Sequence, residues 1–175
     1  MHKNYLKTID NVFELEYQQY LYNVCKNASF KIGWNDNILV DLLQRVYFYH
    51  RFEDIVYKDT LLESKIRSTE FGEVLKNHKI GNAVINCARP GETYYHHAHD
   101  QDEMVVLYYP NTRWQKEWGG ETMFYDSKSN ELIYASEYKS NRILLFDGTI
   151  PHCVRPPTYI SDQFRFTIAT FFIPK

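Results

Sequence analysis

Residues 79–109 read KIGNAVINCARPGETYYHHAHDQDEMVVLYY, and this stretch decides the fold. It contains three short runs rich in β-branched and aromatic residues, at 79–88, 92–99 and 103–109, with turn-forming residues between them. Such runs are typical of β-strands, because these side chains pack well on a pleated surface. Similar runs continue toward the end of the sequence, at 121–125, 131–134, 142–146, 152–154 and 164–172. Eight short strands in series predict a double-sheet jelly roll.

The residues before this region follow a different pattern. Apolar residues recur at helical spacing after Asp10 and again over 38–49, and a shorter helix is expected over 68–76. The length of 175 residues is that of one typical domain. We therefore expect a single domain, 1–175, with a largely helical support in 1–78 and the jelly-roll core in 79–175.

The composition excludes several classes of protein. Lysine and arginine number 20 against 22 aspartates and glutamates, so no basic excess favours binding to nucleic acid. The apolar content of 44% excludes a chain that is disordered as a whole. No stretch is apolar and long enough to suggest a membrane span or a signal peptide. The three cysteines are too widely spaced for a zinc ribbon or a disulfide framework, and they favour a reducing, cytoplasmic location.

Histidines are concentrated in one place. His97 and His99 are two residues apart on a predicted strand, so they share one face of the sheet, whereas His96 points the other way. Two imidazoles that meet a third from a distant strand, such as His152, can hold a divalent transition metal. A solvated loop is the competing interpretation of this cluster.

Four further motifs follow in order, at 105–111 (VVLYYPN), 118–126 (WGGETMFYD), 142–152 (RILLFDGTIPH) and 164–169 (FRFTIA). With them, the sequence resembles the 2-oxoglutarate- and Fe(II)-dependent oxygenases, in the branch that contains prolyl hydroxylases. The opening motifs at 9–13 and 30–34 resemble the start of small phage and bacterial members. The resemblance covers most of the chain and implies a double-stranded β-helix, which is a jelly roll.

The resemblance implies an iron site built from a His-x-Asp pair and a distal histidine, and the distal histidine matches His152. The first histidine of the family best matches His97, and the usual aspartate position is then His99. Three alternatives follow. The ligands are His97, His99 and His152, which is the set we favour; Asp100 or Asp102 completes a site with one carboxylate; or the site is degenerate.

The resemblance also implies that a basic residue on the last strands binds the distal carboxylate of 2-oxoglutarate. Arg165 matches that residue, and strand alternation puts Thr167 on its face. The hydroxyl of Tyr109 matches the group that assists this contact in prolyl-hydroxylase-like members. A surface ion pair between Arg165 and Asp162 is the alternative interpretation.

Two more residues each have two candidate roles. Arg155 is a second candidate for binding an anion, or for contacting substrate. Trp114 either packs over the turn at Gly119 and Gly120, which permit positive φ angles, or contacts substrate.

The expected function is therefore that of a dioxygenase that uses Fe(II), 2-oxoglutarate and dioxygen. Such an enzyme hydroxylates a C–H bond of its substrate and releases succinate and CO2. The sequence leaves the oligomeric state open, and the substrate can be a peptide or a small molecule. The alternatives are a three-histidine metalloenzyme of the cupin kind that does not use 2-oxoglutarate, and a non-catalytic jelly-roll binding module.

Overall fold

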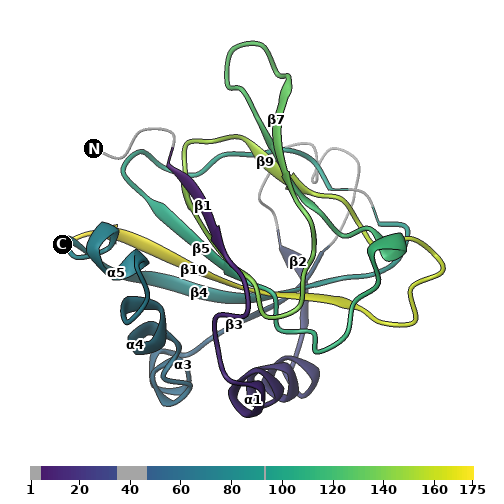
Figure 1. The fold of residues 1–175 in the computed structure, drawn as a ribbon, viewed down its shortest axis with the longest axis horizontal. Coiled ribbons are helices and arrows are strands. Elements are labelled where there is room, and N and C mark those ends of the chain that lie inside the picture. The colour runs from purple at the N-terminus through teal and green to yellow at the C-terminus, as the bar shows by residue number, and fades with distance from the viewer. Residues whose placement is uncertain (1–4, 35–46, 93) are drawn as a thin grey trace.

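The computed structural model describes residues 5–34, 47–92 and 94–175 (Figure 1). The helices are α1 (Leu15–Lys26), α3 (Asp54–Asp59), α4 (Leu62–Arg67), α5 (Phe71–Val74) and the 3-10 helix η1 (Lys116–Trp118). The strands are β1 (Leu6–Ile9), β2 (Lys31–Trp34), β3 (Tyr47–Arg51), β4 (His78–Ala88), β5 (Met104–Tyr108), β6 (Thr122–Tyr125), β7 (Leu132–Ser136), β8 (Ile143–Asp147), β9 (His152–Val154) and β10 (Arg165–Pro174).

These strands form two sheets. The larger sheet has seven strands in the order β1-β8-β5-β10-β4-β3-β2, and the smaller has three in the order β7-β6-β9. Helices α1, α3, α4 and α5 lie together on the outer side of the larger sheet, away from β6, β7 and β9 (Figure 1). This arrangement of two sheets is the predicted jelly roll, with helices covering one sheet.

Strand β10 shows how the larger sheet separates a core from a site. Its even-numbered residues Phe166, Ile168 and Phe172 are buried in an apolar core with helix residues such as Leu21 and Ile66. Its odd-numbered side chains, from Arg165 to Phe171, line a cavity on the opposite face. Both faces are therefore covered, which agrees with the burial of every residue from 165 to 172 except the half-buried Phe171.

The described residues of 1–78 contain strands in addition to the predicted helical support, which is represented by α1, α3, α4 and α5. These strands include β1, β2 and β3, of which β1 pairs with β8 and β3 pairs with β4. Most of the predicted helix over 38–49 lies outside the described residues, but Tyr47–Tyr49 belong to β3, because β4 offers a free edge to this aromatic segment. The predicted helix over 68–76 is reduced to the four residues of α5.

Seven of the eight strands predicted after residue 78 are confirmed, with ends that differ by at most two residues. The exception is 92–99, where His97 is the one described residue that forms a β-bridge. The N–H of His97 donates to the carbonyl of His152, the first residue of β9, and the N–H of His99 donates to the carbonyl of Gly148, directly after β8. These two separate contacts replace the continuous ladder of a partner strand.

No helix in the described part of the chain is long and apolar enough to cross a membrane.

Candidate metal and co-substrate site

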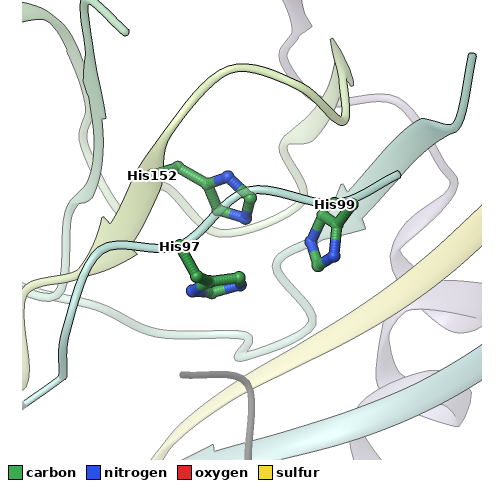
Figure 2. Close-up of side chains that lie close together, drawn as sticks. All are labelled: His97, His99 and His152. Atoms are coloured by element: carbon green, nitrogen blue, oxygen red, sulfur yellow. The ribbon is translucent and has the colours of Figure 1, made fainter. Parts of the chain in front are cut away.

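Three histidines converge at one end of the space between the sheets. His97 and His99 come from the segment between β4 and β5, and His152 begins β9. Their candidate ligand atoms all lie within 4.8 Å of one another. Figure 2 shows the three rings turned toward a common centre. The structure thus brings together the three histidines of the predicted set.

The backbone fixes this arrangement. His97 and His152 form a two-way antiparallel bridge, and the N–H of His99 donates to the carbonyl of Gly148 at 2.7 Å. The Nδ1 atom of His152 lies 2.9 Å from the carbonyl oxygen of Ile150, so Nδ1 carries the proton and donates it. That contact leaves Nε2 of His152 with a lone pair for a metal.

Burial keeps the imidazoles of His99 and His152 neutral. It lowers the pKa of His152 well below its ordinary value, and repulsion from His97 and His99 lowers it further. Burial, aided by His97, also lowers the pKa of His99 to about 4. At neutral pH these two rings are therefore uncharged, which is the form that binds metal.

Apolar rings surround the cluster. Phe146 lies 4.6 Å from the ring of His152, and Phe171 lies 5.1 Å from the ring of His99, between centroids. Phe124 stacks on His152 at 5.8 Å. These side chains exclude water from one side of the cluster and lock the orientation of two imidazoles.

The candidate carboxylates lie elsewhere. Asp100 and Asp102 are exposed, and Asp102 lines a separate cavity of about 420 Å³ together with Asp147 and His78. Among the described residues, no aspartate or glutamate joins the three-histidine cluster. The alternative in which Asp100 or Asp102 completes the site therefore has no support in this geometry.

A cavity of about 70 Å³ extends from the histidines to Arg165. Arg165 is 1% exposed, and its Nε and Nη2 groups donate to the carbonyl of Gly120 at 2.7 Å and to Oγ1 of Thr122 at 3.0 Å. No carboxylate of the described chain lies within ion-pair distance of it; Asp162 pairs with Arg113 instead. A buried guanidinium without an anion is energetically costly, so this end of the cavity favours a negatively charged ligand.

Thr167 and Tyr109 lie in different environments. Thr167 is buried and lines the cavity opposite Asn86 of β4, its partner in the sheet. Tyr109 is fully buried and lies outside the cavity wall, where its hydroxyl is 2.7 Å from Oγ1 of Thr122. Its ring stacks on Tyr138 at 4.6 Å. Tyr109 therefore contacts the cavity lining through Thr122 and through Arg165, whose guanidinium carbon lies 5.4 Å from the centroid of its ring.

Arg155 and Trp114 do not line this cavity. The exposed Arg155 lies 3.7 Å from a carboxylate oxygen of Glu121. Trp114 donates its indole N–H to the carbonyl of Gly119 and packs on Trp118 and Tyr138. Trp114 therefore packs over the turn at Gly119 in this structure.

Sequence reasoning missed several cavity residues. Thr122 belongs to the 118–126 motif, in which the sequence pattern indicates a role only for Gly119 and Gly120. Tyr47 and Tyr94 stack at 4.4 Å on the cavity wall. Strand alternation could have identified Thr122. It is two residues from Phe124 on β6, so both side chains share one face, and Phe124 packs on His152.

A model of the 2OG-Fe(II) oxygenase superfamily matches residues 83–173, which include the three histidines and Arg165. The chain belongs to this superfamily. It is therefore an oxidoreductase of the dioxygenase class, with Fe(II) as its metal and 2-oxoglutarate as its co-substrate. No curated protein matches the sequence.

Solved structures support the same fold. A prolyl-4-hydroxylase from Pseudomonas putida is 14% identical with a TM-score of 0.69, over 99% of this chain and 94% of that one. A prolyl hydroxylase from Trichoplax adhaerens, solved with a peptide fragment of hypoxia inducible factor, is 19% identical with a TM-score of 0.67, over 99% and 85%. HygX from Streptomyces hygroscopicus, solved with nickel and 2-oxoglutarate, is 11% identical with a TM-score of 0.64, over 97% and 82%. These similarities confirm the double-stranded β-helix.

Proposed function

We propose that this oxygenase binds Fe(II) through His97, His99 and His152, binds 2-oxoglutarate with its distal carboxylate at Arg165, and hydroxylates a C–H bond of its substrate. One observation carries the proposal. A single cavity is lined by three imidazoles in mutual contact range and by a buried guanidinium that has no carboxylate partner in the described chain.

The donor set fits the metal. Neutral imidazole is a good ligand for Fe(II), and the low pKa values of His99 and His152 keep these two rings deprotonated at neutral pH. Three imidazoles contribute no negative charge, so they neutralise none of the positive charge of the metal, and anionic ligands can bind to it. A dianionic co-substrate therefore fits between this metal and Arg165.

The protein residues position and enclose the reaction. When bound, Fe(II), 2-oxoglutarate and dioxygen supply the oxidising chemistry, in which the co-substrate becomes succinate and CO2. Arg165 holds the distal carboxylate by charge and by a two-pronged hydrogen bond, which lysine cannot reproduce. Phe146 and Phe171 exclude water beside the histidines, and the contact with Ile150 fixes the ring of His152.

The substrate class remains broad. Two of the similar structures are prolyl hydroxylases, and one of them was solved with a peptide fragment. We therefore propose that the substrate of this chain is a peptide or a small molecule. We also propose that residues 1–175 act as one oxygenase domain, because strands from both parts of the chain share the larger sheet.

A second candidate is a metalloenzyme that uses the three histidines without 2-oxoglutarate. The observation that favours it is the third imidazole at the usual carboxylate position. It predicts that Fe(II) binds but that Arg165 has no role in co-substrate binding.

The first experiment is an anaerobic titration of 2-oxoglutarate into the Fe(II)-loaded protein, followed by the visible metal-to-ligand charge-transfer band. A saturable band in the wild type, with at least tenfold weaker binding in Arg165→Lys and unchanged iron content, supports the proposed function. Bound iron without a band supports the second candidate. Absence of both would favour a non-catalytic module.

A further inference from the structure

Strand β7 is an outer strand of the smaller sheet and has a highly exposed apolar surface. It pairs with β6, and no other described strand lies against its outer edge. Leu132, Ile133 and Tyr134 are 54%, 55% and 37% exposed, and Ala135 is exposed as well. In Figure 1, β7 lies at the top, where the chain projects from the body of the molecule. A contiguous apolar patch of this kind marks an interaction site.

The edge of β7 offers backbone groups as well as apolar side chains. Residues 132–136 read LIYAS and contain no lysine, proline or other charge, which are the usual protection of an edge strand. Protection is limited to a length of five residues and to a bulge at Ile133, which has no partner residue on β6. The N–H and C=O groups of an outer edge can pair with a further strand, so this edge suits a short extended segment.

A shallow groove lies beside this edge. It has a volume of about 310 Å³ and is lined by Tyr134 and by Leu6, Lys7 and Thr8 of β1. Because β1 is an outer strand of the larger sheet, the groove lies between one outer strand of each sheet. None of these four residues lines the cavity of the three histidines. A segment bound here therefore does not have to enter that cavity.

Two carboxylates frame the apolar stretch. Glu131 and Glu137 lie at the two ends of β7, and neither forms an ion pair with a described residue. The cations that follow in the sequence, Lys139 and Arg142, pair with Asp10 instead. The edge is thus apolar at its centre and negative at both ends, and its charge is complementary to a segment with basic ends.

A second copy of this chain does not match that pattern. Antiparallel pairing of β7 with itself over residues 132–136 centres on Tyr134, and it sets Glu131 of one copy opposite Glu137 of the other. Like charges directly opposite each other in a sheet are destabilising. The charges therefore favour a different partner over self-association.

We infer that the outer edge of β7 binds an extended segment of a partner protein as an added strand, with apolar side chains at the centre of the segment and a lysine or arginine at each end. The basic residues lie opposite Glu131 and Glu137. β7 is two strands from β9, which begins with His152, and this separation is roughly 10 Å at the usual spacing of strands. The bound segment is therefore a docking element and not the reacting part of the substrate, and the inference does not depend on the proposed function.

The test uses a fluorescein-labelled peptide, Lys-Val-Thr-Val-Thr-Val-Lys-amide, whose lysines have the same spacing as Glu131 and Glu137. Its binding to the full-length chain is followed by fluorescence anisotropy. One control peptide has glutamate in place of both lysines, and another is N-methylated at alternate residues, which removes the N–H donors of one edge. The protein variants are Ile133→Lys and the double variant Glu131→Gln with Glu137→Gln. Leu15→Lys is the matched control, because Leu15 is an exposed apolar residue on α1, 72% exposed.

We expect the wild type to bind the lysine peptide at least about 10-fold more tightly than the glutamate peptide, since two attractive cross-strand pairs replace two repulsive ones. N-methylation should weaken binding about 10-fold or more, because the backbone hydrogen bonds are lost. Ile133→Lys should weaken binding at least about fivefold, since a lysine on an edge opposes strand addition. The double variant should reduce the preference for lysine ends to less than about threefold, and Leu15→Lys should stay within about twofold of the wild type.

Three results would overturn the inference. They are the absence of saturable binding of the lysine peptide to the wild type, equal binding of the N-methylated peptide, and equal losses in Ile133→Lys and Leu15→Lys. Sedimentation of the wild type alone tests the other occupant. A dimer that dissociates in Ile133→Lys but not in Leu15→Lys would assign this edge to a second copy of the chain and also overturn the inference. Circular dichroism of each variant shows whether its fold is intact.

Discussion

The backbones of His97 and His152 are joined by two hydrogen bonds, from His97 N–H to the His152 carbonyl at 3.0 Å and from His152 N–H to the His97 carbonyl at 2.8 Å. The bridge connects a loop to the first residue of β9 and leaves the two rings 4.5 Å apart between centroids. Two candidate ligands from distant parts of the chain are thus held together by backbone, and metal binding does not have to organise them.

This arrangement predicts that His152→Ala removes the metal site. We expect Fe(II) affinity to fall at least about 100-fold. Loss of a residue that only hydrogen-bonds to a metal ligand typically lowers metal affinity by about 10–100-fold, and loss of a ligand itself should cost more. Equilibrium dialysis with metal analysis measures the effect. His96→Ala is the matched control, because His96 is exposed, adjacent in sequence and outside the cluster. Stoichiometric iron in His152→Ala would exclude this residue as a ligand.

The position of His99 gives a second prediction. His99→Asp should retain stoichiometric Fe(II), because it restores a two-histidine, one-carboxylate site, whereas His99→Ala should lose metal. Asp102→Asn should bind Fe(II) within about twofold of the wild type, since Asp102 lines a different cavity. Asparagine is chosen because residue 102 has a φ of 65°, which asparagine tolerates. Loss of metal in Asp102→Asn would show that this loop rearranges to bring Asp102 to iron.

The three-histidine cluster was accessible from sequence because its signals are local. His97 and His99 share a face through simple alternation, and His152 follows an apolar strand and a turn. The predicted strand around the first two is wrong, yet the side chains converge, because the bridge to His152 imposes an extended conformation at His97 itself.

The role of Tyr109 was not accessible in the same way. Its motif places it correctly after β5, but only the three-dimensional structure shows Thr122 between its hydroxyl and the cavity. Similarly, Asp10 has the chemistry of a helix cap, and nothing local reveals that its partners are Arg142 and Lys139, more than a hundred residues away. Side chains that find distant partners override local preferences.

Two adjacent glycines give a matched pair of variants. Gly120 has a φ of 87°, and an added Cβ would lie 3.0 Å from Trp114 and 3.3 Å from the Cδ atom of Arg165. Gly119 has a φ of 68°, but its nearest neighbour would be 3.5 Å away. Both alanine variants should lose about 1–2 kcal/mol of stability from backbone strain.

Only Gly120→Ala should also displace Arg165. We therefore expect its 2-oxoglutarate affinity to fall several-fold more than that of Gly119→Ala, at unchanged iron content. Chemical unfolding and the anaerobic titration measure the two effects separately. Equal affinities in the two variants would mean that the side chain of Arg165 adjusts without cost.

The ion pairs of Asp10 predict a stability change in acid. Asp10 accepts hydrogen bonds from Nε of Arg142 at 2.6 Å and from Lys139 at 2.8 Å. The bond from Arg142 is the main reason that the pKa of Asp10 falls from 3.8 to about 2. Because the folded pKa lies below the unfolded one, this carboxylate stabilises the fold above about pH 4, and the contribution disappears as the pH falls toward 2.

Asp10→Asn isolates that contribution. The side chain of Asp10 is 34% exposed, so solvent screening limits the expected loss at pH 7 to about 1 kcal/mol. The difference between wild type and variant should shrink below pH 4 and approach zero near pH 2, in urea unfolding followed by tryptophan fluorescence. Asp162→Asn, which breaks a more exposed pair with Arg113, should change stability by less than about 0.5 kcal/mol at pH 7. The stability difference between wild type and Asp10→Asn could instead stay constant from pH 7 to pH 2. That result would show that packing of the Asp10 side chain, and not the charge on its carboxylate, stabilises the contact with Arg142.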